Sequence, residues 1–276
     1  MITSELIENT KERRKVLYKP MVQKKFPSNP KEVFKAFKNL KSEQIKKLSL
    51  SAVIVILFGV FNNARIIGSP HPENNCYYDA IHDWSTPLNY FYRGNQTYMA
   101  FITIFGGLLL DIIFLFSFFS WAIYSVDWRL GINVLLFYGI RYIMNETARF
   151  SLANYGYLPY PGFPSLVVGY IPGDDFFFSG HCGFPMVNMM EYMWLKKYKF
   201  AAFCAFTTLI EMFLMLINRE HHTIDVIVGI VFAQYISIHG RNWIKFLYDH
   251  FEFLKRLKMN NRKELKRINV EWDIGN

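Results

Sequence analysis

Cysteine is scarce in this sequence, which has only Cys76, Cys182 and Cys204. None belongs to a CxxC pair, so the sequence indicates neither a thiolate metal centre nor a disulfide framework, although a single Cys76–Cys182 bridge stays open. The first 47 residues lack the apolar run of a cleavable signal peptide, so we expect the first apolar segment to act as its own signal. No nucleic-acid-binding motif occurs, which argues against a nucleic acid as partner despite the net charge of +9.

Charged and apolar residues are segregated along the chain. Of its 31 Lys and Arg residues, 13 lie in residues 1–47 and nine lie from Arg241 onward. The residues between these basic ends are strongly apolar, and 52% of the whole chain is hydrophobic. Such segregation is typical of membrane proteins. We therefore expect the basic ends to meet an anionic membrane surface.

Six apolar segments are candidates for membrane spans, and they predict an all-α polytopic membrane protein with six transmembrane helices. The segments are Leu48–Ala64, Met99–Tyr124, Leu130–Met144, His181–Leu195, Phe200–Ile217 and Thr223–Ile244. The predicted organisation is a basic arm over residues 1–47, a membrane domain over 48–244 and a basic tail over 245–276. Within the arm, residues 31–47 have near-helical apolar spacing, which fits either an amphipathic helix on the membrane or a short solvated helix.

The distribution of basic residues also predicts the topology. With a cytosolic N-terminus, 26 of the 31 Lys and Arg residues fall on the cytosolic side, including the short Lys196–Lys199 connection. This bias predicts cytosolic N- and C-termini. It places the connecting loops 65–98, 149–180 and 218–222 on the lumenal or extracellular face.

Two polar segments on that face carry candidate chemistry. The first runs from Asp175 to Ser179-Gly180-His181, and the second is His221-His222-Thr223-Ile224-Asp225. One helix can descend from His181 to the lysine-rich connection and a second can return to His221, so both histidines are expected at the same membrane face.

The residue types suit phosphoryl exchange. Asp225 lies four residues after His221, on the same helical face, where it can orient the imidazole. Backbone N–H groups at Ser179-Gly180 can bind phosphate oxygens. One histidine would attack phosphorus while the other protonates the leaving alkoxide. His222 is an alternative nucleophile, because it lies three residues from Asp225.

Other polar residues leave alternatives open. Arg141 and Glu146, near the end of the third segment, fit either a phosphate clamp and a headgroup contact or an internal ion pair. The remaining histidines are expected to be ordinary polar residues at the membrane interface. They are His71, His82, His239 and His250.

The two segments resemble the signature motifs of the sphingomyelin synthase family, within the lipid phosphatase/phosphotransferase superfamily. The first motif matches at Asp175 and Ser179-Gly180-His181, and the second at His221 through Val226. This chain departs from the family at Gly173-Asp174, where the family has Cys-Gly, and at His222, where it has Tyr. Phosphatidylcholine:diacylglycerol cholinephosphotransferases share both motifs, so the acceptor is either ceramide or diacylglycerol.

The resemblance implies transfer of phosphocholine from phosphatidylcholine through a phosphohistidine, without a metal and without a cofactor. It implies His181, His221 and Asp225 as catalytic residues. The expected substrate-binding residues are Ser179, Gly180, Asp175, Arg141, Glu146 and His222. The expected partners are a phospholipid and either ceramide or diacylglycerol, and a homodimer is possible. The expected location is the Golgi, endoplasmic reticulum or plasma membrane.

Two other functions compete with this interpretation. A lipid phosphate phosphatase would use the same histidines with water as acceptor, but the Arg-Pro of that branch is absent from this sequence and Met215 stands six residues before His221. A non-catalytic membrane scaffold would have no need for the intact His181, His221 and Asp225.

Overall fold

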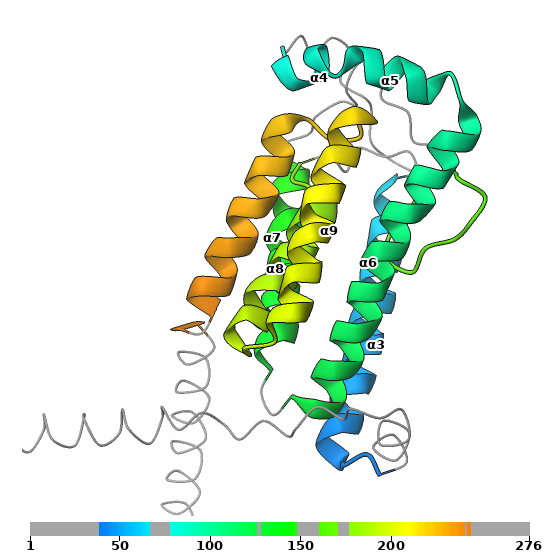
Figure 1. Cartoon of the computed structure of the whole chain (residues 1–276). Helices are drawn as coiled ribbons and strands as arrows, with labels where there is room; N and C mark the ends of the chain where they lie inside the picture. The colour runs from blue at the N-terminus through cyan, green and yellow to red at the C-terminus, as the bar shows by residue number, and fades with distance from the viewer. Residues whose placement is uncertain are drawn as a thin grey trace, which may run out of the picture. The chain divides into compact units, whose positions relative to one another are not determined.

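The structure, a computed structural model, describes residues 39–66, 78–125, 128–147, 160–170, 177–240 and 242–243 (Figure 1). These residues form helices and turns and contain no strand. They divide into two compact units, one comprising the described residues up to Val60 with Leu115–Trp128, and the other comprising the rest. The expected all-helical class is thus confirmed for the described part of the chain, whereas the predicted domain boundaries at 47 and 244 stay a prediction.

The first unit contains most of α3 (Ser42–Ile66) and the end of α6 (Gln96–Tyr124). Lys47 is buried here, and its ammonium group donates to the Ser125 carbonyl at 3.1 Å. The same ammonium lies 5.2 Å from the rings of Trp121 and Trp128, so cation–π contact helps to offset its burial. Helix α3 begins six residues before the predicted span, so Ser42–Lys47 continues that helix, and residues 31–38 of the predicted surface helix lie outside the described residues.

The second unit contains the helices that carry the polar motifs. They are α7 (Arg129–Thr147), α8 (Gly180–Trp194), α9 (Tyr198–Ile217) and the helix Thr223–Gly240. Helices α8 and α9 pack together as a hairpin, and α8 also packs on α7. The turn between α8 and α9 holds Lys196 at a φ of 55°, and it comprises the lysine-rich connection expected to be cytosolic.

A buried ion pair joins α7 to α8. The Arg129 guanidinium donates to Glu191 through Nε at 2.8 Å, and Nη2 lies 2.6 Å from the other carboxylate oxygen. The Trp194 ring covers the guanidinium at 3.4 Å. This bidentate contact pairs the two charges. Without it, their burial between the two helices would carry a large desolvation free energy.

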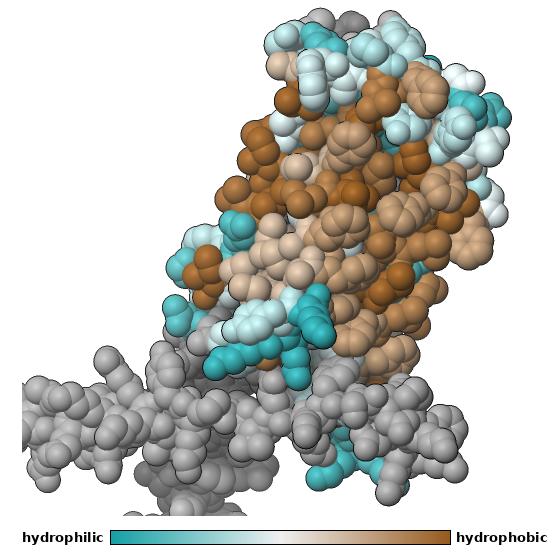
Figure 2. All heavy atoms as spheres, viewed as in Figure 1, coloured by the Kyte–Doolittle hydropathy of each residue, from teal (hydrophilic) through white to brown (hydrophobic). Residues whose placement is uncertain are grey.

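Within the part of the chain that the structure describes, three helices are long and apolar enough to cross a membrane: α6, α9 and Thr223–Gly240. On α9 and Thr223–Gly240 the outward apolar side chains are at least half exposed, namely Phe206, Leu209, Phe213, Ile224, Ile227, Val231 and Ile238. Figure 2 shows this hydrophobic surface as a brown band over the two helices. Exposed apolar helix faces of this length fit contact with lipid, so the chain is an integral membrane protein. Six spans and the orientation of the termini stay predictions.

A short helical cap covers one end of the second unit. It consists of α4 (Ala80–Trp84) and α5 (Thr86–Arg93), within a stretch predicted only as a loop. The Asn89 amide donates to the Ile217 carbonyl at 2.7 Å, so α5 satisfies the C-terminal end of α9. The cap therefore lies against the turn between α9 and Thr223–Gly240, where the second polar motif begins.

Gly229 sets how closely the helix Thr223–Gly240 approaches the first motif. A Cβ atom at this position would lie 2.5 Å from the Ser179 carbonyl oxygen and 3.3 Å from its nitrogen. Both neighbours are backbone atoms, which cannot rotate away. Only glycine therefore allows the two motif-bearing segments to touch here.

We predict that Gly229→Ala lowers the free energy of unfolding by about 1–3 kcal/mol, because the methyl group forces the helix away from Ser179. The measurement is the thermal midpoint of detergent-purified protein. Gly139→Ala on α7 is the matched control, since a Cβ there meets no atom within 4 Å. Equal midpoints for the two variants would contradict the proposed close packing.

Candidate active site

The two predicted motifs meet at the starts of two helices. Ser179 is the N-cap of α8, and its backbone N–H donates to the Asp225 carbonyl at 3.0 Å, within the first turn of Thr223–Gly240. This hydrogen bond joins the backbone of the first motif directly to the backbone of the second. The N–H groups that open α8 therefore lie beside the second motif, as phosphate binding at this helix start requires.

His181 and His221 face each other across this junction. Their ring centroids are 5.9 Å apart, and the planes meet edge to face at 64°. His221 is 4% exposed, whereas His181 is half-buried. The expectation that α8 and α9 return both histidines to one end of the molecule is therefore confirmed.

Asp225 is fully buried, and its carboxylate holds the backbone of the second motif. The Oδ2 atom accepts the His222 N–H at 2.9 Å and lies 3.9 Å from Nδ1 of His221. The second distance exceeds a hydrogen bond, so the carboxylate acts on the imidazole through its charge at this separation.

Arg141 supports the first motif from α7. Its Nε donates to the Phe178 carbonyl at 2.7 Å, and a Cβ at Gly180 would approach Nε at 3.3 Å. The guanidinium thus lies directly beside the start of α8, where a phosphate group would bind. Glu146 is half-buried on the same helix, five residues after Arg141. Asp175 lies outside the described residues.

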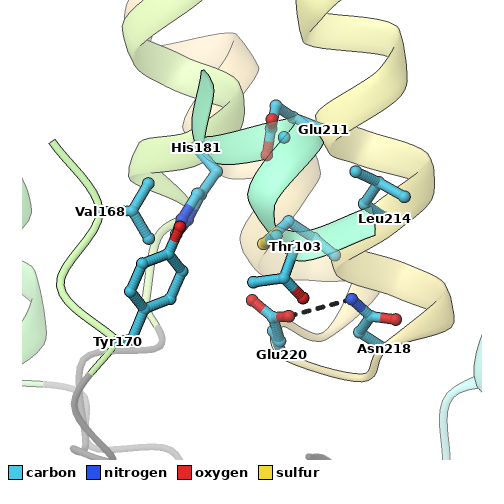
Figure 3. Close-up of a pocket in the computed structure, with 11 residues that line it drawn as sticks. Thr103, Val168, Tyr170, His181, Glu211, Leu214, Asn218 and Glu220 are labelled. Atoms are coloured by element: carbon cyan, nitrogen blue, oxygen red, sulfur yellow. Dashed lines mark hydrogen bonds between the residues drawn. The ribbon is translucent and has the colours of Figure 1, made fainter. Parts of the chain in front are cut away.

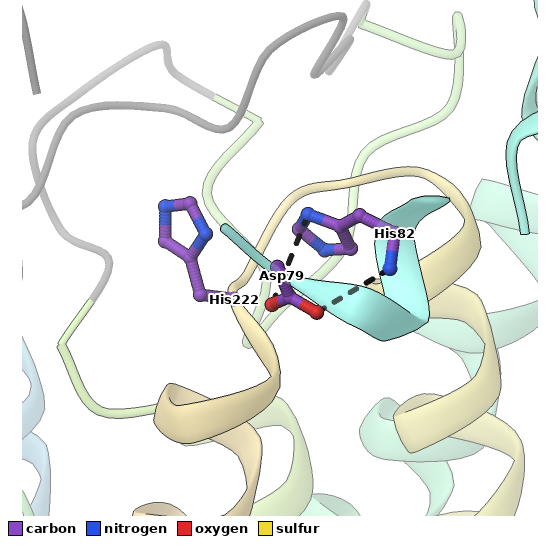
Figure 4. Close-up of side chains that lie close together, drawn as sticks. All are labelled: Asp79, His82 and His222. Atoms are coloured by element: carbon purple, nitrogen blue, oxygen red, sulfur yellow. Dashed lines mark hydrogen bonds and ion pairs between the residues drawn. The ribbon is translucent and has the colours of Figure 1, made fainter. Parts of the chain in front are cut away.

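The His222 ring lies among different side chains from the His221 ring. Its ring centroid is 5.5 Å from that of His82, and the Asp79 carboxylate lies beside both rings (Figure 4). His82, which is expected to be an ordinary polar residue at the membrane interface, is packed inside the second unit. It is 6% exposed, and its Nε2 lies 2.9 Å from the His221 carbonyl.

The cap fixes the turn that precedes the second motif. Arg219 has a positive φ of 56°, and its Nη2 donates to the His82 carbonyl at 2.8 Å and to the Thr86 hydroxyl at 2.6 Å. Sequence reasoning missed this role, because the partners are 137 and 133 residues away along the chain. No local pattern around Arg219 or His82 indicates their contact.

A small cavity of about 20 Å³ lies beside His181, large enough for one water molecule. Glu211 and Glu220 both line it (Figure 3), and the Asn218 amide donates to Glu220 at 3.1 Å. Burial raises the pKa of Glu220 to about 7. The surroundings of His181 are thus acidic on one side, with a carboxyl group that changes charge near neutral pH.

The arrangement can perform displacement at phosphorus. A nucleophilic imidazole with a buried carboxylate, a second imidazole within reach, and helix-start N–H groups beside a guanidinium are the parts that a phosphohistidine mechanism needs. They come from α7, α8, the helix Thr223–Gly240 and the turn before it that holds His221, and the close contacts at Ser179, Gly180 and Gly229 bring these segments together.

Comparison with known families agrees with this geometry. The family described as PAP2 superfamily C-terminal matches residues 174–239, the segment that contains both motifs. The match supports a place in the lipid phosphatase/phosphotransferase superfamily and a phosphatase- or phosphotransferase-type function. Searches of curated proteins and of solved structures found no match to this chain.

Proposed function

We propose that this protein is a membrane phosphotransferase that moves phosphocholine from phosphatidylcholine to the hydroxyl group of ceramide or diacylglycerol. The observation that carries the proposal is the edge-to-face pair of His181 and His221, 5.9 Å apart at the junction of two helix starts. Two imidazoles this close can act on one substrate group, one as nucleophile and the other as proton donor. The resemblance to sphingomyelin synthases adds the headgroup and the acceptors.

The reaction proceeds in two displacements. His221, oriented by the charge of Asp225, attacks phosphorus, and the bond from phosphorus to the diacylglycerol oxygen breaks as His181 protonates that oxygen. Phosphocholine is then bonded to His221. In the second step His181 removes the proton of the acceptor hydroxyl, whose oxygen attacks phosphorus and releases His221. Arg141 and the N–H groups at the start of α8 stabilise the negative phosphate oxygens.

Burial supports transfer to a lipid, since His221 and Asp225 are almost entirely shielded from solvent. The carboxylate of Glu220, beside His181, supports a cationic headgroup bound nearby, because its negative charge would attract a quaternary ammonium group. One observation favours the second candidate, a lipid phosphate phosphatase: the same cavity has room for one water molecule next to His181.

We place the site on the lumenal or extracellular face, in the Golgi, endoplasmic reticulum or plasma membrane. The 20 residues of α9 separate the site from the lysine-rich turn at its other end. That length corresponds to about 30 Å, the thickness of a bilayer core. A cytosolic lysine turn therefore puts the histidines on the opposite side.

The test is lipid transfer by the purified full chain in detergent, with phosphatidylcholine and fluorescent ceramide or diacylglycerol. We expect labelled sphingomyelin or labelled phosphatidylcholine, and a loss of at least about a hundredfold in His181→Ala and His221→Ala, because each removes a proton-transfer or nucleophilic group. His239→Ala is the control, since that ring contacts Tyr235 near the other end of its helix. Release of free phosphocholine or phosphate without a lipid product would replace transfer with hydrolysis.

The charge of Glu220 predicts a pH dependence of substrate binding. As the pH rises through about 7, Glu220 loses its proton and gains attraction for a quaternary ammonium group. We therefore expect the KM for phosphatidylcholine to fall with rising pH. Glu220→Gln should remove this dependence and raise KM at high pH by roughly three- to tenfold, equivalent to ~0.7–1.4 kcal/mol. An unchanged pH profile in the variant would exclude Glu220 as the titrating group.

A further inference from the structure

We propose that Asp79, His82 and His222 form a binding site for a divalent transition-metal ion such as Zn²⁺. One carboxylate oxygen and one ring nitrogen from each histidine lie within 4.8 Å of one another. All three residues are buried or nearly so, and they come from two segments about 140 residues apart. The site adjoins the proposed catalytic pair but shares no residue with it.

The donor set and its spacing suit zinc. Two imidazole nitrogens and one carboxylate oxygen, with a fourth position for water, are ligands that zinc commonly takes. Zinc–ligand bonds of ~2.0–2.2 Å place tetrahedral ligand atoms roughly 3.4 Å apart. Nδ1 of His82 and Oδ2 of Asp79 are 3.9 Å apart, and the three ligand atoms lie within 4.8 Å of one another, so binding needs an inward movement of less than about 1 Å per ligand.

The hydrogen bonds of His82 favour a metal-binding tautomer. Its Nε2 lies 2.9 Å from the backbone carbonyl of His221, and a carbonyl can only accept. Nε2 therefore carries the proton, as in metal sites where a ligating histidine donates its other N–H to a carbonyl. This leaves the lone pair on Nδ1, facing the Asp79 carboxylate at a distance too long for a hydrogen bond. The Nδ1 lone pair and the carboxylate charge repel each other. A cation between the two atoms would attract both.

Asp79 is held in place and retains capacity for a cation. Its Oδ1 accepts the Thr223 hydroxyl at 2.8 Å and the Ile81 N–H at 3.1 Å, while Oδ2 accepts the Thr223 N–H at 2.7 Å. A carboxylate oxygen has two lone pairs, so Oδ2 can accept this bond and still bind a metal ion. Ligating carboxylates are typically fixed in this way by neighbouring donors.

A bound ion would link the cap to the catalytic turn. Asp79 and His82 belong to the segment that includes α4, whereas His222 precedes the helix Thr223–Gly240. The ion would fix the backbone on either side of His221 without contacting phosphorus. It also makes His222 a ligand, which removes it as the rival nucleophile.

The test uses the full chain in detergent, stripped with EDTA, equilibrated with ZnCl₂ and desalted before elemental analysis. We expect about one tightly held zinc ion per chain, with affinity reduced at least about tenfold in Asp79→Asn, His82→Gln and His222→Gln. His239→Gln is the matched control and should bind like the unaltered protein. Equal zinc in all variants, or none in the unaltered chain, would overturn the proposal.

A second measurement distinguishes a loss of zinc binding from a failure of the variant to fold. Zinc should raise the thermal midpoint of the unaltered protein and of His239→Gln, because it binds the folded state. It should leave the midpoint of monodisperse Asp79→Asn unchanged, since asparagine keeps the acceptor for Thr223 but lacks the charge. A zinc-dependent rise of the same size in Asp79→Asn would contradict the site. Both readouts are independent of lipid transfer, so they stand whether or not the proposed reaction is correct.

Discussion

The site depends on the contact between the start of α8 and the helix Thr223–Gly240. The Ser179 N–H donates to the Asp225 carbonyl, and Gly229 lets the second helix lie directly on the Ser179 backbone. These backbone contacts fix where both helix starts lie, and therefore where His181 and His221 project. A phosphoryl-transfer site needs that precision, because reacting groups misplaced by about 1 Å lose much of their effect.

Long apolar runs made most of the fold predictable. The predicted spans and the observed helices agree to within a few residues for α7, α8, α9 and Thr223–Gly240, including the 15-residue α8, which is short for a membrane span. The same spacing predicted that His181 and His221 lie at the same membrane face, because the second helix of a hairpin returns to the level at which the first one starts. The length of the apolar segments and the spacing of the motifs were enough for this prediction, without knowledge of the tertiary contacts.

The cap and its contacts could not be predicted in this way. Asp79 accepts hydrogen bonds from Thr223 at a separation of 144 residues, and His82 supports the His221 carbonyl from a segment read only as a loop. These contacts arise from how the helices pack, which a single sequence does not encode locally. Likewise, the i, i+4 spacing placed Asp225 near His221, but it did not indicate that the carboxylate bonds the His222 N–H instead.

The proposed reaction requires that His221 carry the headgroup as a covalent intermediate. Mass spectrometry can detect this intermediate in the full chain, quenched after incubation with phosphatidylcholine in the absence of acceptor and digested under non-acidic conditions. We expect phosphocholine bonded to His221, and no such adduct on any residue in His221→Ala. An adduct on His222, or a productive enzyme that never carries one, would contradict the proposed reaction.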